Sequence, residues 1–136
     1  MTMKAIPDTH HDLLSDEKRV FLYLGTTMAD GGAQVSPVWF NTDDEHILVN
    51  SARGRLKDLN MRTRPIVGMT IADPENPYRY ILVRGPVVEI TEDGADEHIN
   101  ALSKKYTGRE TFTYNDPEER RVIYRIKPEK VATSGK

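Results

Sequence analysis

The stretch Ser51-Ala52-Arg53-Gly54-Arg55-Leu56-Lys57-Asp58-Leu59-Asn60 lies where one hydrophobic pattern gives way to another. Before it, His46 to Asn50 is rich in apolar residues, which suits a buried strand. After Gly54, apolar residues fall near helical spacing until Pro65 stops the pattern. The stretch therefore predicts a strand-to-helix junction, and this junction carries three cations: Arg53, Arg55 and Lys57.

Such a junction has several features that favour an anion, above all a phosphate. Backbone N–H groups at a helix start are unpaired, and the helix dipole attracts negative charge there. Gly54 allows the backbone to approach a ligand closely, and the cationic side chains can donate charge-assisted hydrogen bonds. The alternative that stays open is that Arg53, Arg55 and Lys57 are simply the solvated face of a surface helix.

Outward from this junction, most of the chain has the alternating pattern of strands. Two short helices are also expected, a lead-in over Leu13 to Lys18 and one that begins near Thr91 or Asp93. This composition of elements predicts a mainly β (α+β) fold, a small antiparallel barrel. The expected strands are Val20 to Leu24, Ala33 to Thr42, His46 to Asn50, Ile66 to Ile71, Tyr78 to Ile90 with a bend at Gly85-Pro86, and Arg121 to Ile126.

The overall composition excludes several classes of protein. With 136 residues, the chain has the length of one domain, 1–136, with flexible ends over about 1–9 and 134–136. Its 19 basic and 21 acidic residues give no global field for nucleic acid or an anionic membrane. No cysteine, secretory signal or membrane span is present, so we expect a cytoplasmic protein. The four histidines show no metal spacing, so no metal site is expected.

Aromatic residues near the junction suit a planar ring. Ser36-Pro37-Val38-Trp39-Phe40 carries the only tryptophan, and Tyr78-Arg79-Tyr80 follows a proline-rich loop. Strand core packing and loop anchoring are the alternative interpretations of these two clusters. The sequence has no G-x-S-x-G elbow, Walker loop or G-x-G-x-x-G fingerprint, which argues against a serine hydrolase, a P-loop enzyme and a Rossmann fold.

These residues together resemble a known family. Pro37-Val38-Trp39-Phe40, the stretch Ser51 to Asn60, Asp73-Pro74 with Tyr78-Arg79-Tyr80, and Val83-Arg84-Gly85 resemble the pyridoxamine 5'-phosphate oxidase-like, FMN-binding split-barrel superfamily, in its branch of flavin- or F420-dependent reductases. The similarity runs from about Val20 to Val131. No substrate-binding C-terminal extension like that of the true pyridoxamine phosphate oxidases follows Val131, which argues against that activity.

The resemblance implies a six-stranded antiparallel split barrel with short flanking helices and a homodimer with the cofactor at the subunit interface. Ser51, Arg55 and Lys57 would then bind the cofactor phosphate, with Arg53 assisting. The strand from Ser36 to Trp39 would line the ring, and two tyrosines would approach from the partner subunit. The full expected set of cofactor-binding residues is Ser36, Pro37, Val38, Trp39, Asn50, Ser51, Arg53, Arg55, Lys57, Tyr78 and Tyr80.

The function expected from this is hydride transfer between reduced F420, or FMN, and a planar conjugated small molecule. The pattern at Lys57 favours F420. No side chain is assigned a catalytic role, because the cofactor performs the chemistry. One alternative is a non-catalytic protein that binds or stores a flavin, haem or tetrapyrrole. Another is a single-stranded nucleic-acid binder that stacks bases on Trp39, Tyr78 and Tyr80, which the net negative charge disfavours.

Overall fold

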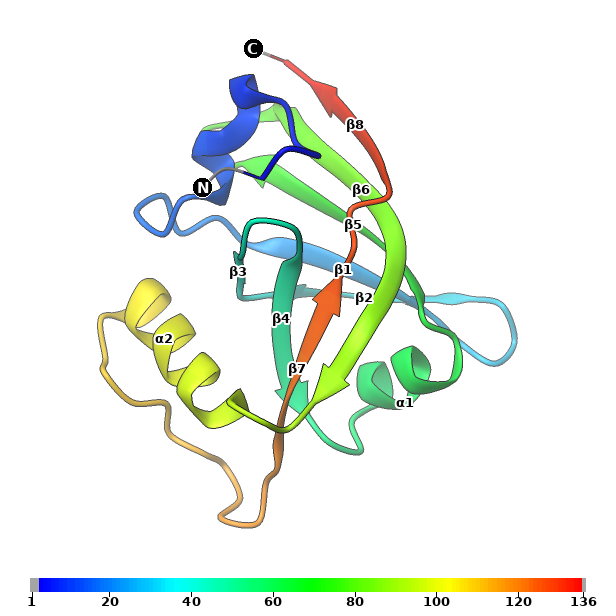
Figure 1. Cartoon of the computed structure of the whole chain (residues 1–136), viewed down its shortest axis with the longest axis vertical. Coiled ribbons are helices and arrows are strands. Elements are labelled where there is room, and N and C mark those ends of the chain that lie inside the picture. Colours follow the sequence, from blue (N-terminus) through cyan, green and yellow to red (C-terminus); the bar gives the residue numbers. More distant parts are fainter. Residues whose placement is uncertain (1–2, 136) are drawn as a thin grey trace.

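The computed structural model describes residues 3–135. They form an antiparallel sheet curled into a half-barrel and three helices (Figure 1). The helices are η1 (Asp8–Leu14, a 3-10 helix), α1 (Leu56–Thr63) and α2 (Ala95–Thr107). The strands are β1 (Leu22–Thr27), β2 (Ala33–Val38), β3 (Phe40–Thr42), β4 (Ile47–Ala52), β5 (Ile66–Asp73), β6 (Asn76–Thr91), β7 (Arg121–Ile126) and β8 (Lys130–Ser134).

The sheet has the strand order β2-β1-β5-β6-β7-β4-β3, and β8 pairs with β6 beside this path. The barrel-like antiparallel fold is confirmed, but the described part of the chain has eight strands where six were expected. One extra strand arises because the predicted strand Ala33 to Thr42 breaks at Trp39: β2 pairs with β1, and β3 pairs with β4. The other is β8, whose short, polar sequence gives little strand signal.

The long strand β6 joins the two halves of the sheet. It pairs with β8 up to Arg84 and with β5 up to Pro86, and from Val87 it pairs with β7. The expected bend at Gly85-Pro86 coincides with this change of partners. A Cβ atom on Gly85 would lie 1.9 Å from the carbonyl oxygen of Lys127, so the segment that connects β7 to β8 passes directly over this glycine.

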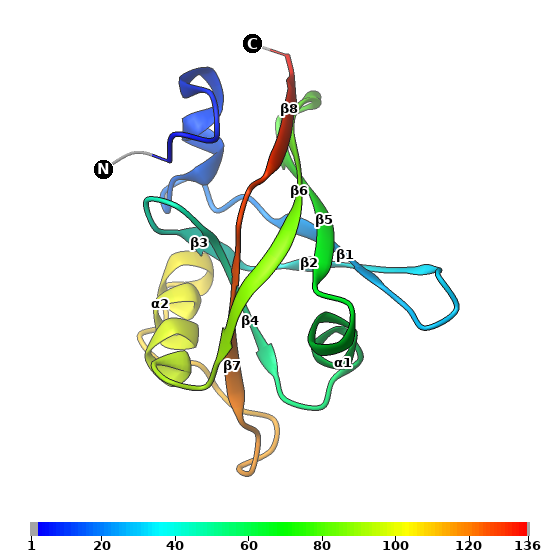
Figure 2. The same cartoon turned by 45° about the vertical axis from the view of Figure 1, so that its right-hand side comes forward.

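Alternation along β4 and β7 gives these strands two covered faces. Val49, Val122 and Tyr124 point into the main core, whereas Leu48 and Ile123 pack against Ala95 of α2. Helices α1 and α2 accordingly lie on opposite sides of β4 and β7 (Figure 2). Successive residues of each strand therefore pack on opposite sides, one in the main core and the next against α2.

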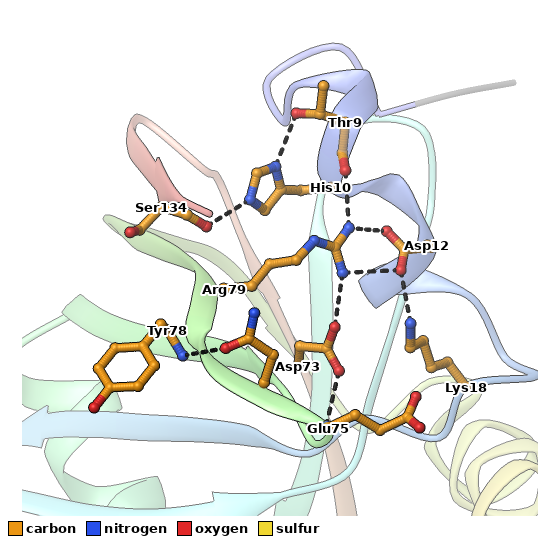
Figure 3. A network of polar contacts seen from close by, with 10 residues as sticks. Thr9, His10, Asp12, Lys18, Asp73, Glu75, Tyr78, Arg79 and Ser134 are labelled. Atoms are coloured by element: carbon orange, nitrogen blue, oxygen red, sulfur yellow. Dashed lines mark hydrogen bonds and ion pairs between the residues drawn. The ribbon is translucent and has the colours of Figure 1, made fainter. Parts of the chain in front are cut away.

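The N-terminal segment differs from its predictions. The lead-in helix lies over Asp8–Leu14 and not over Leu13 to Lys18, and Met3 and Ile6 are buried in the core where a frayed end was expected. Polar contacts reinforce this packing (Figure 3): Arg79 of β6 donates to the carboxylate of Asp12 and to Thr9 O at 2.9 Å, and the ring of His10 bonds Ser134 O at 2.8 Å. Ser134, the first residue of the expected flexible C-terminal end, is instead the last residue of β8 and pairs with Tyr80 of β6. Met1, Thr2 and Lys136 lie outside the described residues.

Candidate functional site

The predicted strand-to-helix junction forms at the end of β4. The strand ends at Ala52, Gly54 takes a φ of +91°, and Arg55 is the N-cap of α1. The positive φ explains the glycine, because L side chains rarely adopt this conformation. The N–H groups in the first turn of α1 have no partner within the helix, so those that follow Arg55 are available to an anion.

The side chain of Asp58, a residue that the sequence did not single out, holds the turn in place by accepting hydrogen bonds. Its carboxylate is fully buried and accepts from Gly54 N–H at 2.9 Å, from Tyr124 Oη–H at 2.6 Å and from Arg62 Nε–H at 3.0 Å. Burial and the contact with this carboxylate hold the pKa of Tyr124 well above its usual range, so the phenol stays a donor. Asp58 therefore fixes the turn to both α1 and β7.

Two of the three predicted cations are already paired with carboxylates. Arg53 donates to Glu92 at 2.8 Å, and Glu92 also accepts from Arg120. Arg55 donates to Glu119 at 3.2 Å, and Glu119 also accepts from Arg121 at 2.8 Å. In each case one glutamate bridges two arginines: Glu92 bridges Arg53 and Arg120, and Glu119 bridges Arg55 and Arg121.

Lys57 differs from its neighbours, since within residues 3–135 no hydrogen bond or ion pair involves its ammonium group. Partial burial, together with the positive charges of Arg55 and Arg121, lowers the pKa of Lys57. Close by in the chain, the hydroxyl of Ser51 is buried and has no hydrogen-bond partner. A buried hydroxyl without a hydrogen-bond partner lowers the stability of the fold, and so does a partly buried cation that has only other cations near it. A bound phosphate would satisfy both groups, so these residues fit a phosphate.

A second unsatisfied hydroxyl lies on β2. Ser36 pairs with Leu24 of β1, whose side chain is buried in the core. The Oγ atom of Ser36 is also buried and has no hydrogen-bond partner. Helix α1 is tied to the same hairpin, because buried Asn60 donates to Thr26 Oγ1 at 3.1 Å and Arg64 Nε donates to Thr27 O at 2.8 Å. Of the predicted ring-lining strand, Pro37 is exposed and Val38 is buried.

Trp39 and Asn50 lie on the α2 side of the sheet. The Trp39 ring stacks on Tyr106 of α2 at 5.3 Å and meets the edge of Phe112. Asn50 donates its amide to Ala95 O at 3.0 Å, and its Oδ1 accepts from Arg121 Nε. Both side chains are thus engaged within the chain, and the structure does not group them with Ser51 and Lys57.

The two predicted tyrosines are far from the junction within one chain. Tyr78 is 82% exposed near the start of β6, just after the β5–β6 turn, and Tyr80 is half-buried two residues further on. This turn lies beside η1, at the end of the sheet away from α1 (Figure 1, Figure 3). The structure therefore places Ser51, Arg53, Arg55 and Lys57 at one strand-to-helix turn, with the tyrosines away from it.

Other parts of the described chain show no competing centre. No three acidic or histidine side chains among residues 3–135 are placed to hold a metal ion. None of the helices in this range is long and apolar enough to cross a membrane. A cavity of about 770 Å³ lies away from the junction and contains no predicted site residue; it is lined by Met3, Lys4, Ala5, Asp43, Asp44, Glu45, His46, Lys127 and Pro128.

Comparisons with known proteins agree with the fold. An F420 reductase of known structure is 31% identical, with a TM-score of 0.79, and the match covers 93% of this chain and 98% of the other. HupZ from Group A Streptococcus is 19% identical, with a TM-score of 0.64 over 94% of this chain and 93% of the other. PhzG from Burkholderia lata, solved with tetrahydrophenazine-1-carboxylic acid, is 17% identical, with a TM-score of 0.61 over 90% and 73%. These last two likenesses show the fold alone.

No curated protein matches the chain in sequence. The family model for pyridoxamine 5'-phosphate oxidase, in contrast, matches residues 6–135, nearly the whole chain. The resemblance seen in the motifs from Pro37 to Gly85 is therefore confirmed, and it points to a flavin- or F420-related function. On this evidence the chain belongs to the pyridoxamine 5'-phosphate oxidase family.

Proposed function

We propose that this protein binds F420, or alternatively FMN, at the junction of β4 and α1 and is an oxidoreductase that acts on a planar conjugated small molecule. The observation that carries the proposal is that one strand-to-helix junction holds both the unpaired ammonium of Lys57 and the buried, unsatisfied hydroxyl of Ser51. The 31% identity to an F420 reductase over nearly the whole chain supports F420 as the first choice.

In this proposal each residue of the junction has a distinct task. Lys57 supplies the positive charge, Ser51 supplies a hydroxyl donor, and the first-turn N–H groups of α1 complete the phosphate site. Arg55 adds a second charge at the edge of the site, and exposed Arg53 a weaker one. The bound ring, when present, would donate or accept the hydride, and the chain would bind it, orient it and exclude water.

The ring is proposed to lie along β2, where Ser36 offers a second unsatisfied hydroxyl. A polar atom of the ring could accept the hydrogen bond that this hydroxyl now lacks. Trp39 then serves the site indirectly, because its stacking on Tyr106 fixes the end of β2 against α2. Its side chain is not proposed to touch the ring.

The protein is also proposed to be a homodimer in which Tyr78 and Tyr80 of one chain approach the site of the other. Tyr78 is too exposed to be part of a core, and it lies at the end of the sheet away from the junction of its own chain. An exposed aromatic side chain of this size is typical of an interface. A second copy would bring this side chain to the ring.

The experiment that tests the proposal is an equilibrium titration of cofactor-free protein with F420 and with FMN, followed by fluorescence. We expect tight binding of one cofactor and about 10- to 100-fold weaker binding by Lys57→Gln, since one charge-assisted bond to the phosphate is lost. Lys104→Gln on α2 is the matched control, because Lys104 is exposed and pairs with Glu110 away from the junction. Its affinity should stay within about twofold of the original.

Turnover is tested separately from binding. The loaded protein, once reduced, should pass its hydride to planar acceptors such as quinones or conjugated cyclic ketones, and the loss of the reduced cofactor's absorbance follows the transfer. Binding without turnover on every acceptor would contradict the oxidoreductase and leave a cofactor-binding protein. Binding of neither cofactor, or equal binding by Lys57→Gln, would contradict the site.

A further inference from the structure

Arg55 and Arg121 converge on one carboxylate from opposite sides of the junction. Arg55 reaches it from the N-cap of α1, and Arg121 reaches it from the first residue of β7. Both guanidinium groups donate to Glu119, Arg55 to Oε1 and Arg121 to Oε2. The two oxygens of the carboxylate are thus divided between the two arginines.

Burial differs sharply among these three side chains. Arg121 is 4% exposed and Glu119 is 8% exposed, whereas Arg55 is 46% exposed. Arg121 is also fixed from behind, because its Nε donates to Asn50 Oδ1 at 2.9 Å and its guanidinium lies 5.0 Å from the centre of the Phe112 ring. Arg121 is therefore a pre-positioned cation, and Glu119 closes it off from solvent.

The junction carries an excess of positive charge. Arg55, Lys57 and Arg121 carry three positive charges, and within residues 3–135 Glu119 is the one carboxylate that pairs with any of them. Burial, and after it the positive charges of Arg55 and Arg121, lower the pKa of Lys57. A dianion such as phosphate would match this excess better than one carboxylate does.

Glu119 belongs to the segment that connects α2 to β7. The first part of this segment is fastened to α2, since Phe112 N–H donates to Asn100 Oδ1 at 2.8 Å and Tyr114 bonds Asp96. Between residues 115 and 118 the hydrogen bonds are local, as in the turn at Asp116. Glu119 lies between this turn and Arg120, whose carbonyl oxygen accepts from Arg53 N–H at 2.9 Å, so its side chain can turn away from the arginines while the backbone on either side stays in place.

We propose that Arg55 and Arg121 form a two-arginine anion subsite that Glu119 fills in the ligand-free protein, and that a phosphate group of the incoming ligand displaces Glu119 from it. The identity of the ligand rests on the proposed function, because the phosphate is taken to belong to a cofactor. The subsite itself rests on the bridge between the two arginines. Arg121 thereby becomes a binding residue, and Glu119 sets the affinity because it competes with the ligand.

Glu119→Gln tests the proposal, with inorganic phosphate, FMN and F420 as three separate probes in titration calorimetry. Removing the competing charge should tighten binding of phosphate about tenfold, and should tighten binding of the cofactor as well. Phosphate should also raise the Tm of Glu119→Gln more than that of the original protein, because the freed arginines gain a partner. Glu89→Gln is the matched control and should leave phosphate binding unchanged, because Glu89 pairs with Arg125 and with none of the cations at the junction.

Each outcome separates the two proposals. Tighter phosphate binding by Glu119→Gln without any cofactor binding supports the subsite and contradicts the proposed function. Cofactor binding that is unchanged or weaker in Glu119→Gln overturns the subsite, because Glu119 then only positions the arginines. If Glu119→Gln does not fold, Glu119→Asp takes its place: it keeps the charge but shortens the bridge by one methylene, and should tighten phosphate binding by a smaller factor than the tenfold expected of Gln.

Discussion

A buried carboxylate is stable only where donors surround it, and Asp58 shows how much of the junction depends on one such group. We expect Asp58→Asn to lower the free energy of unfolding by about 3 kcal/mol, since it breaks the buried pair with Arg62 and weakens the bonds to Gly54 and Tyr124. Tyr124→Phe, which removes one donor, should cost about 1.5–3 kcal/mol. Urea unfolding measures both.

The control for these variants is Asp30→Asn in the exposed β1–β2 turn. There the side chain accepts from Gly32 N–H at 2.9 Å, and an asparagine can accept the same bond. Its effect should stay within about 0.5 kcal/mol. An equally small effect of Asp58→Asn would show that the buried hub does not stabilise the turn.

His98 makes stability depend on pH. Its Nε2–H donates to Asn41 Oδ1 at 2.8 Å, and its Nδ1 accepts from Asn50, an arrangement that requires the neutral ring. Burial, together with the positive charges of Arg125 and Arg121, lowers the pKa of His98 from 6.5 to about 4. The unfolded chain therefore takes up this proton first as the pH falls, and stability is lost between about pH 6.5 and 4.

The variant His98→Gln isolates this effect, because glutamine can donate and accept but does not titrate in this range. The original protein should lose up to about 3 kcal/mol more stability than His98→Gln between pH 7 and 4. Urea unfolding at several pH values gives this difference, in which the titration of the acidic residues cancels. Parallel curves for the two proteins would contradict the assignment.

At the junction, sequence reasoning found the residues that act locally and missed those that act across the sheet. Ser51 and Lys57 are recognisable because a strand pattern, a glycine and a helix pattern follow one another. Glu119 and Arg121 lie more than sixty residues further on in the chain, and they reach Arg55 because Arg121 pairs with Ala52 in the β4–β7 register. No local pattern encodes that pairing.

Strand β6 depends on one glycine where it changes partners. Because a Cβ atom on Gly85 would lie 1.9 Å from Lys127 O, Gly85→Ala must push apart two backbone segments. We expect it to lower the free energy of unfolding by about 3 kcal/mol or more. The matched control is Gly68→Ala on β5, where the new Cβ would meet Val83 O at an ordinary 4.0 Å. Thermal unfolding compares the two, and equal Tm values would show that the backbone adjusts at Gly85.

The strand predictions succeeded where alternation was regular and failed where a strand changes its partner. Regular alternation in β5 reflects one covered and one less covered face, and its position was predicted closely. The bounds of β7 were also predicted, although both of its faces are covered, whereas β1 lies over Leu22–Thr27 and not over Val20 to Leu24. The break at Trp39 was invisible, because Trp39 fits the alternation on either side of it. The 3-10 helix at Asp8–Leu14 was displaced, since its stability comes from Arg79 and the core and not from its own propensity.

The outer face of the sheet shows how two whole chains could meet. Pro37, Tyr23, Thr70 and Leu82 form one row across β2, β1, β5 and β6, while their neighbours along each strand point into the core. Tyr23 is 45% exposed and Leu82 is 41% exposed. An apolar row of this kind on a sheet face is typical of a protein–protein contact. It is the surface on which we expect the second copy to pack.

Introducing charge into this row should separate the two chains. We expect the original protein to sediment at twice the chain mass of 15.5 kDa, and Tyr23→Glu with Leu82→Glu to sediment at the chain mass, because two buried carboxylates per chain would lie unpaired in the interface. Val88→Glu, at a 50% exposed position on the other half of β6, should stay dimeric. The same variants also test whether Tyr78 and Tyr80 complete the partner's site. If they do, the monomeric double variant loses cofactor affinity, whereas Val88→Glu keeps it. A monomeric double variant with full affinity would place both tyrosines outside the site, and a double variant that stays dimeric would place the interface on another face.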